Sequence, residues 1–454
     1  MSHTHAPVFS LLVAAVLAAG CESGDQPLTP LEERAELRFI HASPDAPSVD
    51  IVGPVTPLVE DLEYKSASPV LSTAAGTTTL RVDADVPGGP VAIFGPEDVE
   101  LAADTVHNVI AIGRASEVDA LVLTAPAAAV SADSVRAQVV HAAPDAPAVD
   151  VYVTAPDAAL EQENPLGSLE FGEATDPVEV PAGEYQIRVS AAGDPASVVF
   201  DSGPVTLPGG ADLLIVAVEN TGPGDAPVSL VVADDRGSFE ILDVATPAEV
   251  RAIHASPDAP AVDVIVNDDF ENPALADVTF GTATDYHALP PGTYNVKVTP
   301  AGNPGVIAID ANLDLAAGTR YSVYAADVLA SIAPYVLVDD NRPVATEAKV
   351  RIVHLAPGAG AVDIYVTEPG ADLEAAAPAF ANVAFRDETG YVSLAGGEYD
   401  VTVTPAGTKE PAIGPTTVEL SDGGVYTAAA RDAEGGGAPF ELILLDDFVD
   451  DSEH

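Results

Sequence analysis

Short runs of alternating apolar and polar residues recur along the chain and predict strands rather than helices. Tyr185, Ile187 and Val189 share one face of such a run, and the polar residues between them share the other. Similar runs begin at Tyr294 and Tyr399, and a glycine shortly before each suits a tight turn. No stretch has a convincing helical period. The pattern therefore predicts an all-β protein.

One segment occurs four times and sets the domain count. It contains His-Ala-Ser-Pro-Asp-Ala-Pro or a variant of it and covers residues 38–50, 139–150, 251–263 and 351–363. Its histidines are 100, 113 and 100 residues apart. This period is too long for a solenoid repeat and matches one small domain per copy.

Each copy contains about six or seven short strands separated by proline and glycine turns. The expected fold is four tandem antiparallel β-sandwich domains with an immunoglobulin-like appearance. Short proline-containing breaks separate the copies, so we expect a semi-rigid array, roughly 120–140 Å long if extended. The predicted sandwiches cover residues 36–125, 134–238, 249–341 and 348–448.

The amino terminus has the pattern of a lipoprotein signal peptide over residues 1–20. The apolar run Val8 to Ala19 is shorter than the ~20 residues of a transmembrane helix. It ends in Leu-Ala-Ala-Gly before Cys21, the single cysteine, and resembles a bacterial lipobox. The absence of Lys and Arg before the run leaves an ordinary signal peptide as the alternative. We expect lipidation of Cys21 and a polar tether over residues 21–35.

Composition narrows the possible partners. The chain has 17 Lys and Arg against 71 Asp and Glu, a net charge of −54, which repels nucleic acid. Disorder is not expected, because 47% of the residues are hydrophobic and they alternate as in strands. Only 4 of the basic residues are lysines, which fits an acidic, salt-adapted (halophilic) surface.

The repeated segment resembles the tandem repeats of a bacterial extracytoplasmic domain of unknown function. The resemblance covers about residues 36–447, nearly the whole chain after the signal peptide. It implies a sandwich domain at the cell envelope, often on secreted or lipid-anchored chains, and implies no activity.

Each copy holds a histidine and an aspartate nine residues apart, which a hairpin could bring together for acid–base or metal chemistry. The histidine falls on the same face as apolar neighbours, which favours a buried structural role. Tandem domains also rarely need one catalytic pair four times. The pairs are His41 and Asp50, His141 and Asp150, His254 and Asp263, and His354 and Asp363.

Two further groups of acids are candidates for Ca²⁺, although a structural role is preferred for both. Asp45, Asp145 and Asp258 fit the second central position of a type I turn. The fourth copy has Gly358 there, which makes a turn but offers no side-chain ligand. The second group ends the last strands of three copies and consists of Asp234, Asp235, Asp339, Asp340, Asp446 and Asp447.

The chain contains no Walker loop, no Gly-x-Ser-x-Gly, no His-Glu-x-x-His and no Cys-x-x-Cys. We therefore expect that the protein is not an enzyme and needs no cofactor. The leading hypothesis is a lipid-anchored protein of the outer membrane or cell surface that has a structural role or binds an envelope or extracellular partner. The alternative is a Ca²⁺-dependent adhesin or carbohydrate-binding array.

Overall fold

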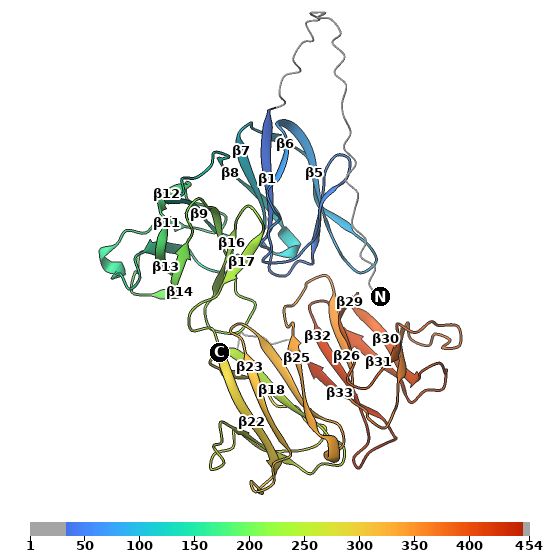
Figure 1. Cartoon of the computed structure of the whole chain (residues 1–454). Coiled ribbons are helices and arrows are strands. Elements are labelled where there is room, and N and C mark those ends of the chain that lie inside the picture. The colour runs from blue at the N-terminus through green and yellow to red at the C-terminus, as the bar shows by residue number, and fades with distance from the viewer. Residues whose placement is uncertain (1–32, 448–454) are drawn as a thin grey trace, which may run out of the picture.

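A computed structural model describes residues 33–447 and contains four β-sandwiches in succession (Figure 1). This confirms the predicted class of four tandem all-β sandwiches. The described part of the chain has short 3₁₀ turns but no α-helix. The predicted signal peptide, Cys21 and most of the predicted tether lie outside the described residues.

The four sandwiches are called repeats 1 to 4. Repeat 1 contains β1 (Arg34–His41), β2 (Val49–Val52), β3 (Pro57–Leu62), β4 (Leu71–Ala74), β5 (Gly76–Ala84), β6 (Val91–Leu101), β7 (Thr105–Ile112), η1 (Ala115–Glu117) and β8 (Asp119–Pro126). Repeat 2 contains β9 (Ser134–His141), β10 (Val149–Thr154), η2 (Leu160–Gln162), β11 (Gly167–Leu169), β12 (Val178–Pro181), β13 (Gly183–Ala191), β14 (Val198–Leu207), β15 (Asp212–Glu219), β16 (Val228–Ala233) and β17 (Ser238–Ile241).

Repeat 3 contains β18 (Ala248–Ala255), β19 (Val262–Val266), β20 (Leu275–Val278), β21 (His287–Leu289), β22 (Gly292–Pro300), β23 (Ile309–Leu315), β24 (Arg320–Ala326), η3 (Leu329–Ser331) and β25 (Ala333–Asp339). Repeat 4 contains β26 (Ala348–His354), β27 (Val362–Thr367), β28 (Phe380–Val383), β29 (Glu388–Leu394), β30 (Gly397–Pro405), β31 (Ile413–Leu420), β32 (Val425–Arg431) and β33 (Glu441–Asp446).

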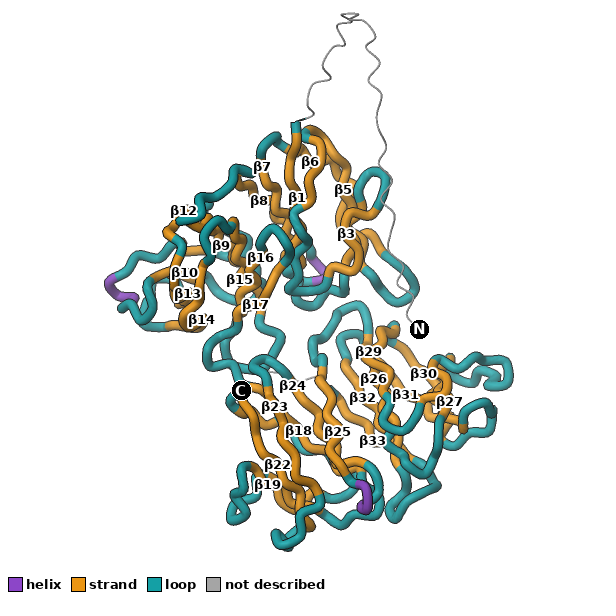
Figure 2. Tube along the Cα trace, in the orientation of Figure 1, coloured by secondary structure: helices purple, strands orange, loops and turns teal. Residues whose placement is uncertain are grey.

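All four repeats share one topology. In repeat 1 the first sheet has the order β4-β1-β7-β8 and the second has the order β3-β2-β5-β6. The central pair β1 and β7 is parallel, with His41 opposite Ala111, and the other neighbours are antiparallel. Repeat 2 adds β17 at the edge of its first sheet. Loops join the strands at the ends of each sandwich (Figure 2).

The core of each repeat lies between its two sheets and follows from the alternating pattern. In β9, Val135, Ala137 and Val139 face inward and are fully buried. They pack on inward residues of the second sheet, including Ile187 and Phe200. The two-residue period of the sequence therefore encodes the inner face of each sheet.

The outer faces of the first sheets are also buried, because the repeats pack in pairs. Ile40, Ile110 and Ile112 of repeat 1 form one apolar cluster with Val140 and Val216 of repeat 2. Strand β17 extends this contact, since Lys65 pairs with Glu240 at 2.7 Å. Two successive sandwiches thus lie back to back, and the length given above for a fully extended array does not apply.

Repeats 3 and 4 pair in the same way, through a cluster that includes Ile253, Tyr324, Val353 and Ile443. The two pairs form the upper and lower halves of the molecule in Figure 1. They contact each other through the segment between repeats 3 and 4. There, Arg342 donates hydrogen bonds to the carbonyls of Pro44 and Ala46 in repeat 1 and lies over the ring of Tyr64, and Ala345 N donates to Asp45 O.

Candidate functional site

The four repeated histidines end the first strand of each sandwich and are buried. A backbone N–H two residues ahead donates to Nδ1 of each ring at 3.3–3.4 Å, so Nδ1 carries no proton. The Nε2–H then donates to a carbonyl six residues ahead, at 2.7–3.1 Å. The four rings belong to His41, His141, His254 and His354, and the carbonyls to Pro47, Pro147, Pro260 and Gly360.

Burial favours the neutral form of three of these rings. It lowers the pKa of His41 to about 4 and also lowers the pKa of His141 and His254. An aromatic ring lies edge-on to each histidine at 6.0–6.4 Å. Because both nitrogens bind the main chain, the histidines hold the loop after the first strand and have no nitrogen available for a metal or a proton transfer.

The repeated aspartates have different partners, so the predicted hairpin does not pair them with the histidines. In repeat 3, Asp263 accepts from the backbone N–H groups of Asp277 and Gly302, both at 2.9 Å. In repeat 4, Asp363 accepts from Asn382 N and Gly407 N, both at 2.8 Å. Each carboxylate thus ties an edge strand to the turn of a neighbouring hairpin.

Repeat 2 keeps this arrangement with one change. The hydroxyl of Ser168 donates to Asp150 at 2.5 Å, and Gly193 N donates at 2.8 Å. Gly193, Gly302 and Gly407 have φ of +76°, +67° and +77°. Side chains disfavour this left-handed region, which explains glycine at the turn.

Repeat 1 lacks the glycine donor. Asp85 N bonds to Ser48 O as Ala192 N bonds to Ala148 O, so Asp85 corresponds to Ala192 and the next residue, Val86, to the glycine. Asp50 keeps only the bond from Asp61 N, at 2.9 Å. Asp85 instead brings a second carboxylate toward Asp50.

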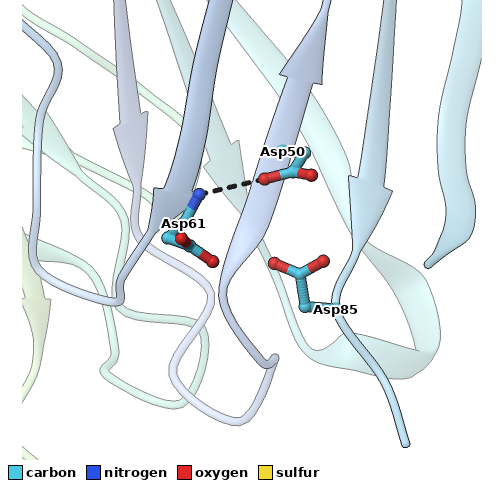
Figure 3. Close-up of side chains that lie close together, drawn as sticks. All are labelled: Asp50, Asp61 and Asp85. Atoms are coloured by element: carbon cyan, nitrogen blue, oxygen red, sulfur yellow. Dashed lines mark hydrogen bonds between the residues drawn. The ribbon is translucent and has the colours of Figure 1, made fainter. Parts of the chain in front are cut away.

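Asp50, Asp61 and Asp85 consequently form a group of three carboxylates (Figure 3). One oxygen from each lies within 4.8 Å of the others. Burial, followed by the charge of Asp50, raises the pKa of Asp85, although Ser48 Oγ donates to it at 3.2 Å. Carboxylate oxygens are the ligands that Ca²⁺ prefers, but clustered acids also simply repel one another.

The sequence analysis identified Asp50 and missed Asp61 and Asp85. The signal was present in the comparison of copies. Repeat 1 has Asp-Val-Pro where repeats 2, 3 and 4 have Ala-Gly, so it gains an acid and loses a turn glycine at once.

Replacing Asp85 with asparagine is expected to stabilise repeat 1 by about 0.5–1 kcal/mol, because it removes repulsion between neighbouring carboxylates. The measurement is the unfolding midpoint at pH 7 with a chelator present, so that the carboxylates act only on one another. The reciprocal variant Ala192→Asp should lower the stability of repeat 2 by bringing an acid near Asp150. A lower midpoint for Asp85→Asn would contradict the repulsion.

The aspartates of the Pro-Asp-Ala-Pro loops contact the loop before the last strand rather than their own turn. Asp45 accepts from Ala115 N at 2.8 Å, and Asp258 accepts from Leu329 N at 2.6 Å. Asp145 pairs with Arg114 of repeat 1. In repeat 4 the bond is reversed, since Gly358 N donates to the carboxylate of Asp432 at 3.2 Å.

Two of the acids at strand ends form a buried ion network between repeats 3 and 4. Arg351 of repeat 4 pairs with Asp339 of repeat 3 at 2.5 Å. The corresponding Arg251 of repeat 3 pairs with Asp447. Both aspartate side chains are 0% exposed, so these charges are fully removed from water.

The network is nearly two-fold symmetric. Tyr286 and Ser322 donate to Asp339 at 2.6 Å, while the corresponding Tyr391 and Thr427 donate to Asp447. Each arginine also lies over a tyrosine ring, Arg251 over Tyr286 at 4.7 Å and Arg351 over Tyr391 at 4.6 Å. Arginine charges and hydroxyl donors therefore compensate both carboxylates.

The remaining acids at the strand ends lie outside this buried network. Asp340 pairs with Lys349 at 2.6 Å, and Asp234 accepts from the backbone N–H groups of Arg236 and Gly237. Asp235 is exposed, 3.8 Å from Arg236, and Asp446 is exposed on β33. Ion pairs thus account for Asp339, Asp340 and Asp447 without a cation.

A segment that could cross the membrane as a helix is not found within residues 33–447. Cys21, the candidate lipidation site, lies outside the described residues.

The model of one protein family, described as "Domain of unknown function (DUF4397)", matches the chain four times. The matches cover residues 35–152, 153–240, 248–365 and 367–454. The first and third run past a sandwich into the first two strands of the next repeat, so the family boundaries differ from the structural ones. No curated protein matches the chain.

Solved structures give distant likenesses. The Bacillus anthracis TIE protein matches at 12% identity and a TM-score of 0.15, over 88% of this chain and 69% of that one. A leucine-rich repeat protein from Bacteroides thetaiotaomicron matches at 15% and 0.13, over 40% and 26%. A product complex of the multi-modular glycogen-degrading pneumococcal virulence factor SpuA matches at 10% and 0.16, over 61% and 38%.

Proposed function

Because the chain belongs to the DUF4397 family, whose description assigns no function, we propose from its own residues that it is a lipid-anchored protein of the bacterial cell envelope. Its role is to present a folded body to another envelope or extracellular protein, not to catalyse a reaction. Acyl groups on Cys21 hold the amino terminus in the outer membrane, and the four repeats extend from there.

One observation carries the non-enzymatic part of this proposal. The histidine of every repeat forms its hydrogen bonds within its own sandwich. The repeated aspartates of repeats 2, 3 and 4 do the same. The most specific motif of the sequence thus maintains a loop and a hairpin. A motif kept for folding in each copy supports a scaffold that offers surface and loops.

The anchor is supported by the sequence alone. The single cysteine follows an apolar run of signal-peptide length and two alanines and a glycine, which are small enough for close approach of a peptidase. Two acyl chains give stable membrane binding where one gives only marginal binding. The acidic surface repels anionic headgroups, so the chain needs such an anchor to stay at a membrane.

The anchor is tested with Cys21→Ser in the full chain, expressed with its own leader. We expect most of the protein to move from the membrane fraction to the soluble fraction, whereas Ser23→Ala, a neighbouring change of similar size, should remain with the membrane. Mass spectrometry of the mature amino terminus should find acyl groups on the wild-type and Ser23→Ala chains but not on Cys21→Ser. Membrane retention of Cys21→Ser would refute the anchor.

The interaction is tested by immobilising the full Cys21→Ser chain and passing envelope extract over it. A charge of −54 attracts cationic proteins unspecifically, and salt screens that attraction. A true partner should therefore stay bound at about 0.5 M NaCl, where the screening length is only a few Å. Loss of every bound protein at that salt concentration would contradict the interaction role.

A further inference from the structure

The interior of repeat 3 is hollow. A cavity of about 410 Å³ lies between its two sheets, whereas the corresponding space in repeat 1 measures about 20 Å³. The buried core of repeat 3 is accordingly split into one cluster around Val262 and Ile309 and another around Leu315 and Tyr321. In repeat 2 a single cluster fills the whole sandwich.

Smaller side chains explain the space. Strand registers align repeat 2 with repeat 3 position by position, and at six aligned inward positions that line the cavity repeat 3 has the smaller residue. They are Ala252 for Val139, Val278 for Leu169, Val296 for Ile187, Ile309 for Phe200, Val323 for Ile215 and Pro334 for Leu230.

Four aligned positions toward one end of the sandwich change in the other direction. Val250 replaces Ala137, Leu289 replaces Val180, Leu313 replaces Val205 and Tyr321 replaces Leu213, and all four belong to or pack with the cluster around Leu315. The lost volume is therefore not recovered in the middle, where Ala252, Val296 and Val323 are only half-buried.

The wall of the cavity is mainly aliphatic, and two of its few polar side chains, His254 and Tyr294, are already engaged. The nitrogens of His254 bind the main chain, and the hydroxyl of Tyr294 donates to Pro290 O at 2.7 Å. Tyr324 packs into the interface with repeat 4. The lining residues Ala274, His287 and Ala288 are exposed, which places the opening at the edge formed by β20 and β21.

The volume falls within the ~300–1,000 Å³ of small-molecule sites, and even a 150 Å³ apolar cavity binds benzene. A mainly aliphatic wall with few free donors or acceptors, between two sheets ~10 Å apart, suits a narrow hydrocarbon chain. Exposed acidic residues lie in β20 or close to β20 and β21 in the sequence, including Glu271, Asp277 and Asp285, and their charge disfavours an anionic head group.

We propose that repeat 3 binds one uncharged aliphatic molecule, a free single-chain amphiphile, with its chain between the sheets and its polar end at the β20–β21 edge. Repeat 3 has this site, whereas the aligned repeat 2 has a filled core and lacks it. The site is independent of the lipid anchor and of any partner protein.

The test titrates decan-1-ol into the full chain in soluble form, Cys21→Ser, by calorimetry. We expect one bound molecule per chain. The double variant Val296→Ile/Ile309→Phe restores the larger residues of repeat 2 and should weaken binding at least about tenfold. Ile413→Phe, the same change at the aligned position of repeat 4, is the matched control and should bind as the wild type does.

Two further measurements distinguish a free uncharged amphiphile from a charged one and from a membrane lipid. Decanoate at pH 7 should bind at least about tenfold more weakly than decan-1-ol, because of its charge. Phosphatidylcholine vesicles should not sediment the protein, since the proposed ligand is free in solution. Sedimentation that the double variant abolishes would instead assign a membrane lipid and overturn the free amphiphile.

If the double variant does not fold, judged by circular dichroism, Val296→Ile alone decides, and it should still weaken binding. Absence of decan-1-ol binding by the wild type, or equal binding by the folded cavity-filling variants, would overturn the proposal.

Discussion

Replacing Arg351 with alanine should lower the unfolding free energy of the repeat 3–4 pair by about 3–5 kcal/mol, the cost of removing one partner from a buried ion pair. Arg351 is 2% exposed and binds Asp339, the carbonyl of Val338 and the hydroxyl of Thr427. Without it, Asp339 keeps the hydroxyls of Tyr286 and Ser322 but loses the guanidinium at 2.5 Å. Arg251, at 3.8 Å, replaces only part of that charge.

Chemical denaturation of the full chain measures this effect, because repeats 3 and 4 should unfold at lower denaturant than repeats 1 and 2. Arg81→Ala is the matched control. Arg81 also pairs with an aspartate, Asp83 at 2.6 Å, but its side chain is 43% exposed, so its loss should affect stability far less than the loss of Arg351. Equal effects of the two variants would contradict a buried network. In a double-mutant cycle with Asp339→Ala, the two losses should be less than additive.

Acidification should destabilise repeat 1 by about 3 kcal/mol between pH 6.5 and pH 4. Burial lowers the pKa of His41 to about 4, from an ordinary value of 6.5. The unfolded chain therefore binds a proton before the folded chain does. The stabilisation is complete above pH 6.5 and is lost as the pH falls toward 4.

The check is a series of unfolding curves from pH 7.5 to pH 4 for wild type, His41→Gln and His287→Gln. Glutamine does not titrate, so His41→Gln should be less stable at pH 7 but should lose much of the pH dependence in this window. His287 is exposed, and its replacement should leave the wild-type slope unchanged. An unchanged slope in His41→Gln would show that other groups cause the acid loss.

The sequence was sufficient for the four sandwiches and for the buried placement of the repeated histidines. His354 follows Val350 and Ile352 at two-residue spacing, so a strand must turn all three toward the same core. The hydrogen-bond partners of these rings could not be predicted from the sequence. A hairpin could have joined His254 to Asp263, but the crossing of the chain between the sheets sends their side chains to different loops.

Pairing of the repeats was missed, although a signal for it exists. In β15, Leu213 and Ile215 face the core while Leu214 and Val216 face repeat 1, so the strand is apolar on both faces. Such a continuous apolar run is typical of a strand covered on both sides. A second apolar face of this kind needs a covering surface, and in this protein the neighbouring repeat supplies it.

The cavity and the group of three carboxylates depend on differences between the repeats. These differences are hard to see in the sequence, because the repeats follow the same strand pattern. Ile309 and Phe200 are both apolar and both fit the strand pattern, and only the register shows that one is a smaller version of the other. Likewise, Asp85 matters because the strand pairing places it beside Asp50. Both features require the spatial correspondence of residues as well as their type.

Back-to-back packing of successive sandwiches makes two copies, rather than one, the smallest self-sufficient length of this chain. Cutting after repeat 1 would bare Ile40 and Ile110, and would bare Val140 and Val216 on the other fragment. A cut near residues 242–247 separates the bond from Arg320 to Thr221 O and the contacts of Arg342 with repeat 1, including the Tyr64 ring, and leaves both apolar seams closed. Gain or loss of such units should therefore be tolerated in even numbers, while an odd remainder would adhere to whatever apolar sheet it met.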